Sequence, residues 1–268
     1  MKYIIFLLLI LLNNFSYPKE FIILQSTTST RDSGFYEHLL PKFEEKYGFD
    51  VRVIAVGTGQ AIANAKKCDA DVLITHHKDS EEQFVKEGYG IFRKEFMFND
   101  YVIIGPKKDP ARIKEANSIN DALKRIVDSN SVFVSRGDDS GTYKKERDLW
   151  LLTDKLPNPK ENNWYLSVGQ GMGGTLNIAI NKDAYTLSDR ATWESFSNKA
   201  EHRVLVSNKS ILLNYYGVIP ISKQKCPNAK LGLAKVFIEW LVSNKTKLII
   251  NNFRINNKQL FFSLDESN

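Results

Sequence analysis

Short apolar runs alternate along the chain with segments in which apolar residues recur every three or four positions. The runs lie at 21–24, 51–56, 71–75, 101–105, 131–135, 184–188, 203–207 and 216–222. Between them, 35–47 and 233–241 show the spacing of one helix face. Strands that alternate with helices predict an α/β fold with mostly parallel sheets.

The first helical segment, 35–47, has apolar residues four positions apart and contains Pro41. Proline inside a helix removes one backbone hydrogen bond, so we expect a break or kink there, with Pro41 opening a second short helix. Asp32 or Ser33 is the expected N-cap, because short polar side chains satisfy the first free N–H groups of a helix.

Two crossings of the chain between lobes are expected from the order of the strands. The stretch "MFNDYVIIGPKKDPARI", 97–113, combines a strand with a Gly-Pro exit, and a return near 200–210 matches it. Such an arrangement places a ligand cleft between two α/β lobes joined by two strands. The expected division is lobe I at 19–104 and 205–268, and lobe II at 105–204.

The first 18 residues, "MKYIIFLLLILLNNFSYP", read as a cleavable signal peptide. A basic start precedes an apolar run from Tyr3 to Leu12, which is too short to span a bilayer. About 250 residues remain, enough for one large domain or two ordinary ones. The formal charge is +6, and Lys2 is the one charged residue of the leader, so +5 remains.

The basic residues are scattered, which permits anionic ligands but lacks the basic stripe of a nucleic-acid-binding protein. Export into an oxidising compartment leaves two states open for Cys68 and Cys226, a disulfide or two buried thiols, because spacing alone does not place their Cα atoms.

Four loops, 26–30, 57–60, 135–142 and 169–175, share one pattern: an apolar run ends in Gly, Ser or Thr and a helix begins. Backbone N–H groups at a helix start, together with hydroxyl groups, bind anions. Arg136 adds a full positive charge, although pairing with Asp138 or Asp139 at the rim is an alternative role. The candidate ligand residues are Thr27, Thr28, Ser29, Thr58, Gly59, Arg136, Ser140, Gly141, Thr142, Gly173 and Thr175.

Other chemistry lacks its usual patterns. The nucleotide-binding motifs GxGxxG and GxxxxGK[ST] do not occur in the sequence. The sequence also lacks the hydrolase motif GxSxG and an evident pair of a nucleophile and a histidine. "HHKDSEE" at 76–82 suggests metal ligands, but adjacent histidines in a strand point to opposite sides. We therefore expect no metal site, no cofactor and no catalytic residue.

Six motifs in order, "STTSTRDSG", "VIAVGTGQA", "FNDYVIIGPKKDPA", "SRGDDSGT", "VGQGMGGTLNIA" and "AYTLSDRATW", resemble the TupA-type tungstate-binding proteins of bacterial tungstate ABC importers. The resemblance spans about residues 21–220. The family's loop is Thr-Thr-Thr-Ser, whereas this chain has Ser26 at the first position, so Ser26 is not counted among the expected ligands. Arg136, Ser140 and Thr142 match the family's oxyanion-holding motif.

This resemblance implies a type II periplasmic-binding-protein fold with two hinged lobes and no enzymatic activity. The expected signal peptide predicts a periplasmic location, and we expect a monomer. Its ligand would be tungstate or molybdate, and its partner the permease of an ABC importer. A phosphate- or sulfate-binding receptor on the same fold is the alternative, and a hydrolase that uses one of the serines is a third. Phosphate keeps a proton near neutral pH and needs an acceptor such as Asp138 or Asp139, whereas tungstate, molybdate and sulfate need donors only.

Overall fold

The structure, a computed structural model, describes residues 19–264, so the expected signal peptide lies outside it. The first part of the chain forms β1 (Phe21–Thr27), α1 (Thr28–Asp32), α2 (Phe35–Tyr47), β2 (Asp50–Val56), α3 (Thr58–Lys66), β3 (Val72–Thr75), α4 (Lys78–Lys86) and β4 (Lys94–Pro106). All eight expected strands are present, and the α/β prediction is confirmed.

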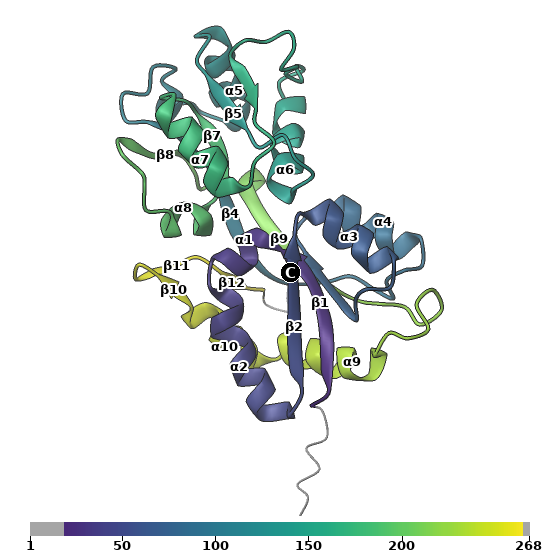
Figure 1. Cartoon of the computed structure of the whole chain (residues 1–268). Helices are drawn as coiled ribbons and strands as arrows, with labels where there is room; N and C mark the ends of the chain where they lie inside the picture. The colour runs from purple at the N-terminus through teal and green to yellow at the C-terminus, as the bar shows by residue number, and fades with distance from the viewer. Residues whose placement is uncertain (1–18, 265–268) are drawn as a thin grey trace, which may run out of the picture.

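The remaining elements complete both lobes (Figure 1). They are η1 (Ile113–Glu115), α5 (Ile119–Asp128), β5 (Phe133–Ser135), α6 (Gly141–Leu151), β6 (Tyr165–Ser167), α7 (Met172–Asn181), β7 (Thr186–Asp189), α8 (Arg190–Ser195), β8 (His202–Val206), η2 (Ser210–Leu212), β9 (Leu213–Pro220), α9 (Leu231–Leu241), α10 (Asn244–Asn252), β10 (Arg254–Ile255), β11 (Lys258–Gln259) and β12 (Phe262–Ser263). None of the helices within 19–264 is long and apolar enough to cross a membrane.

The main sheet has the strand order β12-β4-β9-β3-β1-β2, with β7 and β8 also paired to β4. Strand β1 runs parallel to β2 and β3, but β9 is antiparallel to both β3 and β4, and β4 is antiparallel to β7, β8 and β12. The expectation of mostly parallel sheets is therefore wrong. The physical reason is that β4 leaves one lobe and β9 returns to it, so these neighbours run in opposite directions.

Strand β4 belongs to both lobes. Its first half, from Lys94 to Asp100, pairs with β9, and its second half, from Tyr101, pairs with β7 and β8. Figure 1 shows β4 and β9 running between the lower lobe, with α2, α3 and α9, and the upper lobe, with α5, α6 and α7. One apolar core contains residues of β1, α2 and α9, whereas the second extends from Tyr101 to Leu212. The lobe bounds expected from the sequence stay a prediction.

Helix α2 is continuous from Phe35 to Tyr47, so the predicted break at Pro41 is wrong. Its buried face, which includes Phe43, packs against Phe237 and Trp240 on the other side of the core. Pro41 lies on the exposed face of α2. The carbonyl that loses its helical partner belongs to Glu37, four residues earlier, which is also exposed. Packing of the buried face along the whole helix outweighs one lost hydrogen bond.

The first helix also begins earlier than expected. Helix α1 starts at Thr28, Asp32 is its last residue and Ser33 its C-cap, so neither Asp32 nor Ser33 is an N-cap. Helix α2 follows Gly34, whose φ of 77° is in the left-handed region that glycine adopts without a Cβ penalty. The hydroxyl-rich stretch is thus the first turn of a helix rather than a loop in front of it.

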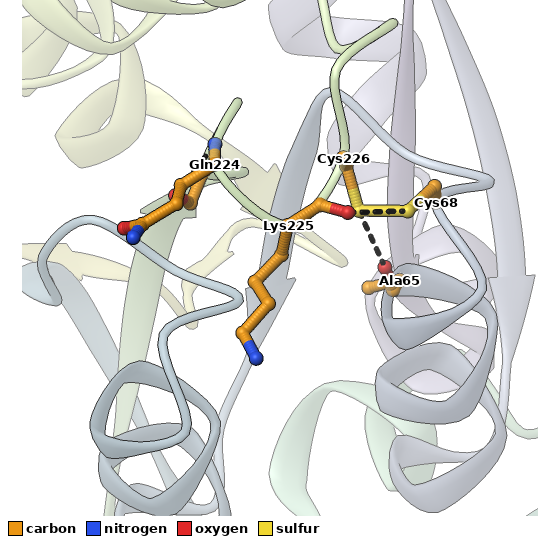
Figure 2. The surroundings of a disulfide bond; sticks show 6 residues. Ala65, Cys68, Gln224, Lys225 and Cys226 are labelled. Atoms are coloured by element: carbon orange, nitrogen blue, oxygen red, sulfur yellow. Dashed lines mark hydrogen bonds between the residues drawn. A yellow bond between two sulfur atoms is a disulfide. The ribbon is translucent and has the colours of Figure 1, made fainter.

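A disulfide joins Cys68 and Cys226, which settles the alternative left open by the sequence. Cys68 follows α3, and Cys226 lies in the segment between β9 and α9, packed against Ala65 and fully buried (Figure 2). Both cysteines belong to lobe I. The bond spans 158 positions of sequence and encloses the whole passage of the chain through lobe II.

The core of lobe II contains a buried carboxyl group, Glu146 of α6, which accepts a hydrogen bond of 2.6 Å from the Tyr165 hydroxyl. Burial raises the pKa of this carboxyl from its ordinary 4.5 to about 7, and the bond from Tyr165 lowers it by less. The folded protein therefore holds this proton up to about pH 7, whereas the unfolded chain releases it near pH 4.5.

We expect Glu146→Gln to change how stability depends on pH. Between the two pKa values unfolding releases a proton, so this carboxyl lowers the free energy of unfolding as pH rises, by about 3 kcal/mol in total. Glutamine can accept the Tyr165 bond but does not titrate. Urea unfolding measured between about pH 5 and 8 should show that the free energy of unfolding of the variant, relative to that of the wild type, rises with pH. A difference independent of pH would contradict this role.

Candidate anion-binding site

The four predicted loops each precede or open a helix in the structure. Helices α1, α3, α6 and α7 begin at Thr28, Thr58, Gly141 and Met172. Each start presents N–H groups that have no acceptor within the helix, at the positive end of the helix dipole. The local arrangement expected from the sequence is therefore present.

Two of these helix starts, from different lobes, are in contact. The Gly59 N–H donates to the Asp139 carbonyl over 3.1 Å, so this predicted donor is already used between the lobes. A Cβ atom on Gly59 would lie 1.3 Å from Asp139 Oδ2, and one on Gly141 would lie 2.5 Å from His76 Cε1. Any larger residue would hold the lobes apart at these two positions.

Arg136 follows β5 and is buried, with 5% of its surface exposed. One guanidinium nitrogen, Nη2, bonds Asp138 Oδ2 at 2.6 Å, whereas Nε is buried and has no hydrogen-bond partner among the described residues. The alternative role, an arginine at the rim of the site paired with an aspartate, is therefore partly wrong. Arg136 does pair with Asp138, but Arg136 is buried inside the protein. A buried, incompletely bonded guanidinium strongly attracts an anion.

The hydroxyl groups of lobe I differ in what they bind. Thr58 Oγ1 is buried without a hydrogen-bond partner among the described residues, and it lies close to Gly141 of lobe II. The Thr27 hydroxyl lies 2.9 Å from that of Thr30 and 3.3 Å from that of Ser29. Thr28 is half-buried at the start of α1. Ser26, which the resemblance left outside the ligand set, instead bonds the Tyr36 hydroxyl at 2.5 Å.

In lobe II, Ser140 and Thr142 flank the start of α6 and are buried. Ser140 is the N-cap of α6, and its oxygen accepts the Tyr143 N–H at 3.1 Å, which leaves the hydroxyl proton available. Gly141 between them packs against His76 and Thr58. The predicted residues of the first three loops are therefore gathered where the lobes meet.

The fourth loop has a different environment. Gly173 is exposed, and the Thr175 hydroxyl donates within its own loop, to the Gln170 and Gly171 carbonyls at 3.3 and 3.1 Å. Because the hydroxyl proton of Thr175 is already used, this side chain is a weaker candidate than Thr58. The part of Gly173 and Thr175 in ligand binding stays a prediction.

His76, which the sequence suggested only as an unlikely metal ligand, lies at the centre of the site. It follows β3 and has 7% of its surface exposed. Its Nε2 atom is 3.4 Å from Ser29 Oγ, and Nδ1 is 3.0 Å from both the Tyr101 hydroxyl and Asn214 Oδ1. The sequence did contain a signal for a role of His76 in the site. His76 follows the carboxyl end of a strand in the parallel part of the sheet, where α/β proteins place ligand-binding residues.

Burial, helped by the nearby positive charge of Arg136, lowers the pKa of His76 from 6.5 to about 4, so the imidazole is uncharged at neutral pH. His77 turns away from it and contacts Ser80, as expected for adjacent histidines. Within residues 19–264 no cluster of three or more His, Cys, Asp or Glu side chains could hold a metal ion.

The acidic pair is already engaged. Asp138 accepts from Arg136 and, through Oδ1, from the Ser140 N–H at 3.2 Å. Asp139 lies 3.0 Å from Lys144 Nζ and is largely exposed. The site therefore offers more free donors than free acceptors, which favours an anion without a proton of its own.

Comparison with known proteins adds independent information. A family model described as a PBP superfamily domain matches residues 17–245. The chain is 43% identical over 237 residues to the tungstate-binding protein TupA of Peptoclostridium acidaminophilum, covering 88% of this chain and 82% of that protein.

Two solved structures align over most of the chain. The tungstate-binding protein TupA of Desulfovibrio alaskensis G20 has a TM-score of 0.81 at 39% identity, and the alignment covers 92% of this chain and 100% of that one. The structure of the tungstate ABC transporter from Geobacter sulfurreducens has a TM-score of 0.80 at 41% identity, with coverage of 87% and 99%. Fold and sequence similarity therefore extend over both lobes.

Proposed function

Because the chain belongs to the PBP superfamily, and within it to the family of the TupA tungstate-binding proteins, we propose that it binds tungstate between its lobes and delivers it to an ABC importer. Molybdate, which has the same charge and tetrahedral shape, is the second ligand of this class. The family membership also fits the two-lobed α/β fold expected from the sequence.

One observation carries the choice of an anionic ligand. Arg136 Nε and Thr58 Oγ1 are buried polar atoms without hydrogen-bond partners among the described residues. They come from different lobes, and the loop that follows Arg136 reaches Thr58 through Gly141. An unsatisfied buried donor costs about 1–3 kcal/mol, which a bound oxyanion would offset. Ligand binding between these atoms would also draw the two lobes together.

The engaged acidic pair supports tungstate over phosphate. Near neutral pH phosphate carries a proton that needs an acceptor directed at the ligand, whereas both Asp138 oxygens face donors of their own loop, one from Arg136 and one from Ser140. Calorimetric titration with tungstate, molybdate, sulfate and phosphate in turn tests the proposal. We expect tight binding of tungstate, and tight binding of phosphate with none of tungstate would overturn it.

We expect Thr58→Val to weaken tungstate binding about 10-fold to 100-fold, the loss of one hydrogen bond to a charged ligand. Valine has nearly the same shape, and the hydroxyl that it removes has no partner within the described chain, so stability should not fall. Thr153→Val is the matched control, because Thr153 bonds the Trp150 carbonyl and lies outside the site. Calorimetry and thermal unfolding of both variants check this expectation, and equal affinities would contradict it.

The sequence argued against a hydrolase because no serine had an evident histidine partner. The structure places His76 Nε2 3.4 Å from Ser29 Oγ, so this premise does not hold. The pKa of His76 is about 4, so its ring is a weak general base at neutral pH, and its Nδ1 faces an amide and a phenol rather than a carboxylate. We therefore propose a binding protein without catalytic activity. Incubation with chromogenic carboxylic and phosphoric esters tests this point, and turnover that depends on Ser29 would contradict it.

The proposal includes a location and a partner. The disulfide fits an oxidising compartment, and we propose export to the periplasm, capture of the anion as a monomer, and docking to the permease of the importer. Separate periplasmic and cytoplasmic extracts, each compared by non-reducing and reducing electrophoresis, test the location, because a protein retained in the cytoplasm would have free thiols and would contradict the proposal.

A further inference from the structure

The buried side chains around His76 form one polar network between the ligand loop and the two strands that join the lobes. Ser29, on the ligand side, belongs to α1. Tyr101 is on β4 and Asn214 on β9, and the Tyr101 hydroxyl and Asn214 Oδ1 each lie 3.0 Å from the second ring nitrogen of His76, Nδ1. All four side chains are buried.

The network continues along the connecting strands. Asn214 Nδ2 donates to Asn99 Oδ1 at 2.7 Å, and Asn99 Nδ2 donates to the Tyr216 hydroxyl at 3.2 Å. The amide oxygen of Asn214 therefore faces His76, so the proton of the neutral ring is on Nδ1. That leaves Nε2 as an acceptor for the Ser29 hydroxyl.

His76 also contacts the opposite lobe. The backbone of Gly141 packs so closely on the ring that a Cβ atom there would lie 2.5 Å from Cε1 and 2.9 Å from Nδ1. One side chain thus touches the ligand loop of lobe I, the start of α6 in lobe II, and both connecting strands. Strand β4 pairs with β9 up to Asp100 and with β7 from Tyr101, and Asn214 of β9 is the register partner of Asn99, so both contacts of His76 lie where the two strands pass between the lobes.

We propose that His76 is a positioning residue that couples the Ser29 ligand loop to the two strands between the lobes, so that ligand binding and lobe closure influence each other through its imidazole. The inference rests on the proposed function, because it concerns the same oxyanion site. Ser29 and Asn214 share no hydrogen bond, and His76 is the side chain that bonds to both. Any energetic coupling between them should therefore depend on His76.

A double-mutant cycle with tungstate as the probe measures this coupling. Ser29→Ala and Asn214→Ser are made singly and together, first with His76 present and then in a His76→Gln background. With His76 present, the combined loss of affinity should differ from the product of the single losses by about 3-fold to 100-fold. In the His76→Gln background the losses should multiply. If the single losses of affinity multiply in both backgrounds, His76 has a purely structural role, and the proposal is overturned.

A second measurement uses the unmodified protein and does not depend on the folding of variants. In the ¹⁵N NMR spectrum of histidine-labelled protein, His76 should show the Nδ1–H tautomer, and tungstate should shift its Nε2 signal as Ser29 turns to the anion. An Nε2 signal unchanged at saturation would overturn the proposal. Failure of tungstate to bind the wild type at all would instead overturn the proposed function, so the two failures are distinguishable.

Discussion

Replacing Arg136 by alanine is expected to weaken tungstate binding roughly 30-fold to several thousand-fold, corresponding to about 2–5 kcal/mol for loss of one member of a buried charge pair. Arg136 is 5% exposed, and the Nε atom of its guanidinium has no hydrogen-bond partner within residues 19–264. Its electrostatic attraction is little screened by water or salt at this depth. Calorimetry of the wild type and the variant at constant ionic strength provides the measurement.

Arg31→Ala is the matched control for the loss of one positive charge. Arg31 belongs to the same hydroxyl-rich segment, but it is about half exposed and pairs with its neighbour Asp32. Its removal should change affinity by less than about fivefold. Equal losses for the two variants would refute the assignment of Arg136 to the site.

Arg136→Ala also leaves Asp138 without its ion-pair partner, and an unpaired carboxylate would itself repel a dianion. The double variant Arg136→Ala, Asp138→Asn separates the two effects. A loss that persists in the double variant indicates that the guanidinium contacts the ligand. Recovery of affinity would show instead that Arg136 acts by neutralising Asp138.

Removing the disulfide is expected to lower the free energy of unfolding by about 4–5 kcal/mol, since the cross-link restricts a long loop in the unfolded chain. The loop spans 158 positions. Cys226→Ala suits its fully buried, apolar surroundings, whereas Cys68→Ser suits its exposed position. Urea unfolding of the double variant and the wild type checks the value.

Tungstate affinity serves as the control for this variant. The bridge lies beyond the C-terminal end of α3, whereas Thr58, a proposed ligand residue, is at the N-terminal end, so affinity should stay within about threefold below the unfolding transition. Identical unfolding of wild type with and without reductant, after complete reduction has been verified by thiol titration, would contradict a stabilising role for the bridge.

The features that the sequence predicted correctly are encoded locally. Strand β3 is a run of mostly apolar residues, and the start of α6 is marked by Ser140 and Gly141, a few positions after the short strand β5. Neither signal requires knowledge of which parts of the chain meet. The burial of Arg136 was not indicated by its place at a strand end, and its part in ligand binding stays a prediction.

The features that escaped prediction depend on contacts between distant residues. His76 and Asn214 are 138 positions apart, and no pattern near either residue indicates that they bond. Pro41 has a strong local meaning, yet packing of α2 against α9 keeps the helix continuous. Strand direction was mistaken for a similar reason, because the path of β9 back to lobe I is set by the two-lobed architecture.

The position of the disulfide has a consequence for the lifetime of the molecule. A protease that cuts one peptide bond between Cys68 and Cys226, for instance in the exposed stretch at 154–156, produces two polypeptides that remain covalently attached. The fragment before the cut keeps Ser29, Thr58, His76 and Arg136 together, and the bridge retains the segment with β9 and α9. In a compartment rich in proteases, a single nick would therefore leave the receptor in one piece, and fragments would separate only after reduction and unfolding.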